Sequence, residues 1–161
     1  MEHYQSGRYG EAEELALSLT EEFAAHPFAW KILGAVLKQT DRRSEAVDAN
    51  QKAVALSPQD AEACNNLGVT LQELGRLAEA EASYRQAIAL NPDYAEAYSN
   101  LGVTLKELGR LEEAEASYRQ AIVLKPDYAE AHSNLVVTLK EMGKLSEAEA
   151  SFTQAIAGNL P

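Results

Sequence analysis

A 34-residue repeat runs through most of the chain and limits its possible folds more than any other feature. Segments 61–94 and 95–128 differ at only six positions. One such unit cannot bury its own apolar face, so a repeat of this length predicts stacked units that cover one another. The positions that carry the repeat are Leu33, Leu67, Leu101 and Leu135; Leu37, Leu71, Leu105 and Leu139; Ala46, Ala80, Ala114 and Ala148; Ala53, Ala87, Ala121 and Ala155; and Pro58, Pro92 and Pro126.

Each unit has the pattern of two short helices. In 95–108 the apolar residues recur at steps of three and four, which places them on one stripe of a helix. Gly109 is expected to end this helix in the left-handed conformation, as are Gly75 and Gly143 in their units. A second helix is expected over 111–124 and should end before Pro126. The apolar stripes are Ala97, Tyr98, Leu101, Leu105 and Leu108 in the first helix, and Leu111, Ala114, Tyr118, Ala121 and Ile122 in the second.

The start of the first helix in two units has the pattern of a capping box. Asp93 is followed three residues later by Glu96, and Asp127 by Glu130. We therefore expect both aspartates to cap the helices that follow them.

Two glycines lie inside the predicted helices, where glycine lowers stability by about 0.5 to 1 kcal/mol relative to alanine. They are Gly68 and Gly102, and we expect the paired helix to approach them closely. Val136 replaces the glycine in the last unit, so a looser or shifted helix pair is expected there.

These residues and their spacing resemble the tetratricopeptide repeat family. The resemblance implies an all-α fold, a right-handed α-solenoid of stacked antiparallel helix pairs whose first helices line a concave face. It also implies a single array over 1–161: a partial unit at 1–26, full units at 27–60, 61–94 and 95–128, and a last unit at 129–161. The motif in one unit consists of Tyr98, Leu101, Gly102, Leu105, Ala114, Tyr118, Ala121 and Pro126.

Both ends of the array have the pattern of incomplete units, so apolar residues near the C-terminus should be partly uncovered. Leu139, Phe152 and Ile156 are the residues expected to be exposed. Two interpretations remain open: a fragment of a longer array, or a short array whose ends associate with another copy.

Composition argues against several classes of function. A formal net charge of -11 and the lack of a dense basic run argue against nucleic-acid binding. No apolar run approaches the length of a membrane-spanning helix and no secretory signal pattern is present, so a cytoplasmic location without membrane attachment is expected.

No set of residues has the spacing of a catalytic, metal or cofactor site, so we expect a non-enzymatic protein without cofactors. The three histidines are scattered and lack ligand spacing. His132 and Cys64 occupy the same position of the repeat as Trp30 and Tyr98, which indicates a packing role. Glutamates such as Glu113 and Glu115 are two residues apart and do not share a helix face.

An asparagine recurs in the first helices, one residue before the repeated leucine, at Asn66, Asn100 and Asn134. The amide both donates and accepts hydrogen bonds, so a column of asparagines can hold an extended peptide backbone whatever its side chains are. The column resembles the asparagine ladder in the repeat domain of O-linked N-acetylglucosamine transferases, whose groove holds extended protein substrates. Alternatively, these asparagines bond between adjacent units or merely reflect the copying of the repeat.

Further candidates for the concave face supply apolar contact and charge. They are Val69, Val103 and Val137, then Lys38, Lys106 and Lys140 with Gln72. The rim is mixed in charge, because Gln72, Lys106 and Lys140 are each followed directly by a glutamate. The predicted function is a non-catalytic scaffold that binds an extended segment of a protein or peptide in this groove. The alternatives are the substrate-recognition part of a larger glycosyltransferase- or sulfotransferase-type enzyme, and a scaffold that assembles end to end.

Overall fold

The computed structural model describes residues 2–158, with side chains from Arg8 onward, and this range contains nine helices and no strand. The helices are α1 (Glu2–Glu22), α2 (Pro27–Gln39), α3 (Arg43–Leu56), α4 (Ala61–Glu73), α5 (Leu77–Leu90), α6 (Ala95–Glu107), α7 (Leu111–Leu124), α8 (Ala129–Glu141) and α9 (Leu145–Gly158).

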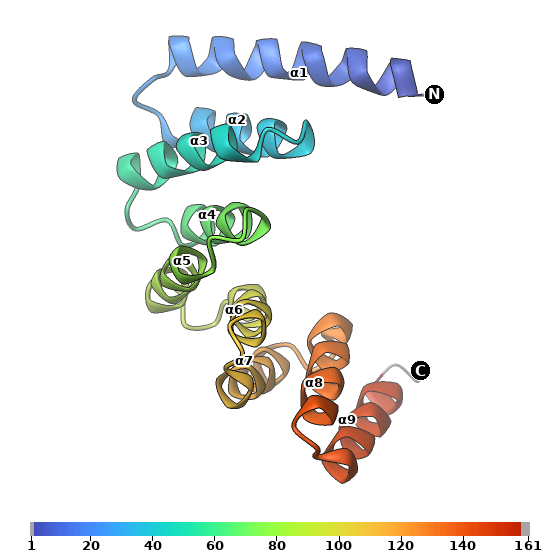
Figure 1. The fold of residues 1–161 in the computed structure, drawn as a ribbon. Coiled ribbons are helices and arrows are strands. Elements are labelled where there is room, and N and C mark those ends of the chain that lie inside the picture. The colour runs from blue at the N-terminus through green and yellow to red at the C-terminus, as the bar shows by residue number, and fades with distance from the viewer. Residues whose placement is uncertain (1, 159–161) are drawn as a thin grey trace.

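The helices pack as successive pairs along an arc, and the two ends of the chain lie far apart along it (Figure 1). α2 packs on α3, α4 on α5, α6 on α7 and α8 on α9, and each pair contacts the next one. The first helices also touch one another, because α6 contacts both α4 and α8. The prediction of an all-α solenoid of stacked helix pairs is confirmed.

Glycine allows the two helices of the middle units to approach closely. A Cβ atom on Gly68 would lie 2.6 Å from Cε1 of Tyr84, and a Cβ atom on Gly102 would lie 2.6 Å from Cε1 of Tyr118. Both tyrosine rings are fully buried. The expected close approach is confirmed, and the atoms that require it belong to these two tyrosines.

The two helices of the last pair pack less extensively on each other than those of the other pairs, as Val136 predicts. Phe152 occupies the position of Tyr118 but is 56% exposed, as expected for the uncovered end of the array. Ile156 is also exposed, as expected, whereas the expectation for Leu139 was wrong. Leu139 is fully buried, because it faces inward in α8 and packs in the same core cluster as Leu135 and Ala148.

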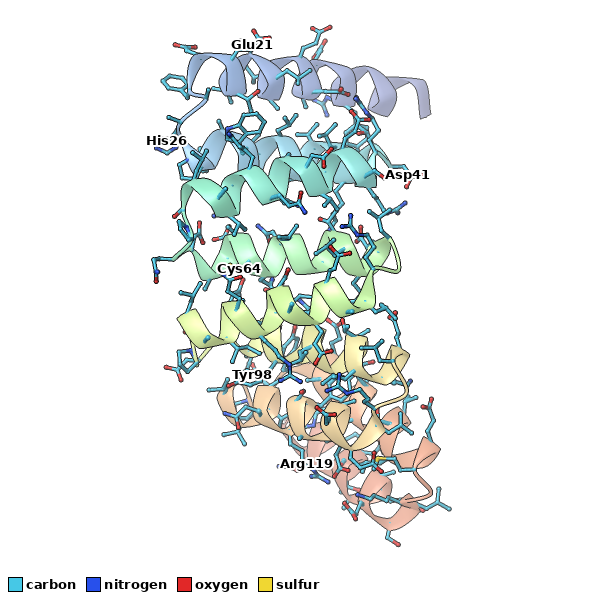
Figure 2. The ribbon with its side chains drawn as sticks, turned by 60° about the vertical axis from the view of Figure 1, so that its left-hand side comes forward. Glu21, His26, Asp41, Cys64, Tyr98 and Arg119 are labelled. Carbon is cyan, nitrogen blue, oxygen red and sulfur yellow. The ribbon has the colours of Figure 1, made fainter. Side chains whose placement is uncertain are left out.

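The turns between paired helices use the left-handed backbone conformation. Gly75, Gly109 and Gly143 have φ angles of 74°, 77° and 76°, as expected for glycines that end helices. Asp41 takes the same place between α2 and α3 with φ 62°, a conformation that aspartate tolerates better than most residues. Figure 2 places Asp41 at the opposite end of this helix pair from His26, which precedes α2.

The predicted capping boxes are wrong. α6 and α8 begin one residue later than Asp93 and Asp127 require, so Tyr94 and Tyr128 occupy the N-cap positions and make no side-chain cap bond. Tyr94 instead packs against a buried cluster that includes Cys64. Tertiary packing of the ring therefore outweighs the cap. Asp60 does cap its helix, because its Oδ1 accepts a hydrogen bond of 3.1 Å from the backbone N–H of Ala63.

Ion pairs join the second helix of one unit to the next unit. Arg110 Nη1 lies 2.8 Å from Glu81 Oε2, and one period later Lys144 Nζ lies 2.9 Å from Glu115 Oε2. Arg119, which follows Cys64 and Tyr98 along the stack in Figure 2, reaches Glu115 of its own helix and also Glu147 of α9, the second helix of the next unit. Single exposed pairs contribute little, but this regular series favours one register between neighbouring units.

Two equivalent tyrosines provide a matched test of the core. Tyr84 Oη donates a hydrogen bond of 2.9 Å to Gln72 Oε1, whereas Tyr118 Oη is buried without a partner, because Lys106 replaces the glutamine. Tyr84→Phe should therefore lower the free energy of unfolding by about 0.5–1.5 kcal/mol. Tyr118→Phe should leave it unchanged or raise it. Urea unfolding followed by circular dichroism measures both, and an equal loss for the two variants would contradict the assignment.

Candidate functional site

A polar hollow lies where the first helices α2, α4 and α6 come together. We call it the concave hollow and define it by Lys31 and Lys38 of α2, Asn66 and Val69 of α4, and Asn100 of α6, all of which line it. Asn50 of α3, Thr70 and Glu96 also line it. The structure therefore brings together four of the candidate groove residues, Lys38, Asn66, Val69 and Asn100, and adds Lys31 to them.

The three asparagines of the column have different surroundings. Asn100 Nδ2 donates a hydrogen bond of 3.1 Å to Oδ1 of Asn65 in the preceding unit. One period later Ser99 takes the place of Asn65, and its hydroxyl is buried without a partner, so Asn134 lacks the equivalent bond. Asn66 and Asn134 are half-buried on α4 and α8. The inter-unit interpretation therefore holds for Asn100.

Two of the three candidate lysines, Lys38 and Lys106, are paired with acids of the following unit. Lys38 Nζ lies 3.5 Å from Glu73 Oε1, and Lys106 Nζ lies 3.1 Å from Glu141 Oε1. In the copy between them, Gln72 Nε2 donates a hydrogen bond of 3.2 Å to Glu107 Oε1. These contacts offset the positive charge that the lysines would otherwise present to a ligand.

Lys31 is the most enclosed cation in the concave hollow. Its Nζ lies 3.1 Å from Asp60 Oδ2 and 2.9 Å from Glu62 Oε1. Burial opposes the charged form, but the bonds to Glu62 and Asp60 hold the pKa of Lys31 above its ordinary value. Lys31 therefore stays charged and fixed at the edge of the hollow.

The remaining candidates lie nearer the C-terminal end of the array. Val103 is partly buried against the main core, while Val137 is 42% exposed. Val137 and Lys140 line a separate groove between α8 and α9. Four of the ten candidate residues therefore line the concave hollow, and two line this separate groove.

The repeat position shared by Trp30, Cys64, Tyr98 and His132 has a structural role that the sequence pattern does not reveal. Trp30 Nε1 donates a hydrogen bond of 2.9 Å to the carbonyl oxygen of Ala24, six residues earlier. His132 Nε2 lies 2.8 Å from the carbonyl oxygen of Pro126, also six residues earlier. In both units, a ring nitrogen ties the first helix to the loop that precedes it.

Cys64 lies at the same position and is buried. Burial raises the pKa of its thiol, with a smaller effect from the charge of Asp60. A raised pKa disfavours the reactive thiolate, which agrees with a packing role.

Within residues 2–158 no helix is long and apolar enough to cross a bilayer. The described side chains also contain no group of three or more histidine, cysteine, aspartate or glutamate residues that could hold a metal ion.

Solved structures share this arrangement of helices. The crystal structure of MamA matches with 24% identity and a TM-score of 0.87, over 97% of this chain and 91% of that one. A MamA structure from Desulfovibrio magneticus RS-1 matches with 21% identity and a TM-score of 0.85, over 96% and 87% of the two chains. PilF of Pseudomonas aeruginosa matches with 19% identity and a TM-score of 0.84, over 99% of this chain and 72% of that one.

The helix pairs, their period and these likenesses define an α-solenoid protein. One model of the tetratricopeptide repeat matches residues 1–61 and 65–129, and a second model of this repeat matches 107–158. The chain belongs to the tetratricopeptide repeat family. Proteins built from this repeat generally mediate protein–protein interactions. A comparison with curated proteins found no match.

Proposed function

We propose that this chain is a non-catalytic scaffold that binds an extended segment of a partner protein along its first helices. The observation that carries the proposal is the concave hollow, which gathers Asn66, Asn100 and Val69 from neighbouring units. Amide groups there offer donors and acceptors to a peptide backbone, and the valine offers apolar contact.

The chemistry of the concave hollow also limits the ligand. Lys31 and Lys38 already contact acids of this chain, so a strongly acidic segment would have to compete with Asp60, Glu62 and Glu73. The proposed ligand therefore has an extended backbone with small apolar side chains and few charges. The likeness of the asparagine column to that of O-linked N-acetylglucosamine transferases supports the extended conformation of the ligand.

The asparagines should contribute unequally to this binding. The amides of Asn66 and Asn134 have no hydrogen-bond partner among the described residues, whereas that of Asn100 is held by Asn65. Substitution of Asn66 or Asn134 should therefore affect binding and leave stability nearly unchanged. Substitution of Asn100 should also lower the free energy of unfolding, by about 1 kcal/mol.

A selection from a library of displayed random linear peptides tests the proposal. Peptides enriched on the wild-type chain should bind the triple variant Asn66→Ala, Asn100→Ala, Asn134→Ala about tenfold or more weakly, because each lost amide removes about 0.5–1.5 kcal/mol. Isothermal titration calorimetry measures the affinities, and urea unfolding confirms that the variant is folded.

A matched control replaces three exposed amides of the second helices, in Gln51→Ala, Gln86→Ala, Gln154→Ala. This variant should bind the selected peptides as the wild type does. Equal affinity of the peptides for the wild-type chain and the asparagine variant would remove the asparagine mechanism. A selection that enriches no peptide would contradict the proposed function itself.

A further inference from the structure

A second surface, separate from the concave hollow, lies between the last two helices. We call it the end groove and define it by Val136, Val137 and Lys140 of α8 with Phe152, Ala155 and Ile156 of α9. Three of its apolar side chains are largely exposed: Val137 by 42%, Phe152 by 56% and Ile156 by 49%. Isolated exposed apolar residues are normal, but a contiguous set lining a groove indicates an interaction surface.

The equivalent residues of the preceding unit show what such a groove accepts. One period earlier, Tyr118 and Ala121 correspond to Phe152 and Ala155, and both are fully buried. The first helix α8 packs on both α7 and α6, and its Leu135 and Leu139 share one buried cluster with Tyr118. The end groove is therefore the same kind of surface that elsewhere in this chain holds an amphipathic helix.

The charge of Lys140 indicates which side chain the helix bound in the end groove should carry. In the earlier copies of the repeat, the residue equivalent to Lys140 meets a glutamate near the end of the next first helix, as in the contact between Lys106 and Glu141. Lys38 meets Glu73 in the same way. Lys140 has no such partner among the described residues, so its charge is available to a glutamate at that place.

We propose that the end groove binds an amphipathic helix of a partner protein, with small and leucine side chains on one face and a glutamate positioned to meet Lys140. The first helices of a second copy are poor candidates, since α2, α4, α6 and α8 are each packed between neighbours within the folded chain. This surface gives the scaffold a helix-binding site in addition to the proposed site for extended segments.

A synthetic peptide with the sequence of α6, residues 95–109, is the probe, because it carries the leucines and Glu107 in the required register. The acetylated and amidated peptide, labelled with a fluorophore, is titrated with the whole chain and followed by anisotropy. Saturable binding is expected below about 1 mM. A scrambled peptide of the same composition should not bind.

Two substitutions on α9 test whether the peptide binds in the end groove or elsewhere on the surface. Ile156→Lys places a charge inside the groove and should weaken binding about tenfold or more. Leu145→Lys changes a leucine that is 61% exposed on the same helix but outside the groove, and should leave binding unchanged. Both positions are exposed, so both variants should fold.

A charge exchange tests the register. Lys140→Glu should weaken binding of the peptide about threefold, and the peptide change Glu107→Lys should restore it, since an exposed pair contributes modestly. Absence of saturable binding, or equal binding by the Ile156→Lys variant, would overturn the proposal.

Two further outcomes would also overturn this proposal. If the peptide loses affinity only for the triple asparagine variant, it binds in the concave hollow, and the proposed function can stand without a helix site. If light scattering shows a dimer that Ile156→Lys abolishes, the occupant of the end groove is a second copy of the chain.

Discussion

Replacing Gly102 with valine is expected to lower the free energy of unfolding by about 2–3 kcal/mol. A Cβ atom at this position would lie 2.6 Å from Cε1 of Tyr118, whose ring is fully buried. The ring has no space to move without displacing the next unit, so the helix pair must separate. The thermal midpoint and the urea midpoint, followed by circular dichroism, measure the loss.

The same substitution at Gly10 is the matched control. Gly10 also lies inside a helix, but a Cβ atom there would meet nothing within 4 Å. Gly10→Val should change the stability by about 0.5 kcal/mol or less, because only intrinsic helix preference is involved. Equal stability of the Gly102→Val variant and the wild-type chain would show that the close approach of Tyr118 is incorrect.

Leu105→Ala is expected to lower the free energy of unfolding by about 2–5 kcal/mol. Leu105 is 1% exposed and belongs to the core cluster that spans several units. Its truncation leaves a cavity between helices that cannot collapse without moving two pairs.

Leu108 supplies the comparison for this second variant. It lies on the same predicted stripe, three residues later, but is 38% exposed at the end of the helix. Leu108→Ala should therefore cost about 1 kcal/mol or less. Similar losses for the two leucines, measured by urea unfolding, would contradict the difference in burial.

Much of the fold could be predicted from the repeat, because the features that decide it are local. The second helix expected over 111–124 is α7, and the glycines at 75, 109 and 143 do end helices. Helical periodicity and the backbone freedom of glycine operate within one unit, so they can be read without knowing what lies opposite.

The helix starts show where this local reasoning fails. Asp93 and Glu96 have the spacing of a capping box, but the helix begins after Tyr94. The ring of Tyr94 packs against a buried cluster that joins Cys64 of its own unit to Ala97 of the next, so its placement depends on how two units meet. A pattern within one unit contains no information about that distance.

The candidate site could likewise be predicted only in part from the sequence. The recurrence of Asn66, Asn100 and Asn134 marks the inner helices, and two of these residues do line one hollow. Only the structure distinguishes Asn100, because its partner Asn65 comes from the neighbouring unit and is replaced by serine in the next copy. The end groove likewise becomes apparent only when Phe152 is compared with the buried Tyr118.

By itself the sequence determined the helix pairs, their 34-residue period and the family, because each depends on the order of residues along one or two helices. The tertiary structure decided which copies of a repeated residue are buried, bonded or free. Nearly identical units become different at their contacts, since a side chain's environment is set by the residues that the adjoining unit places against it.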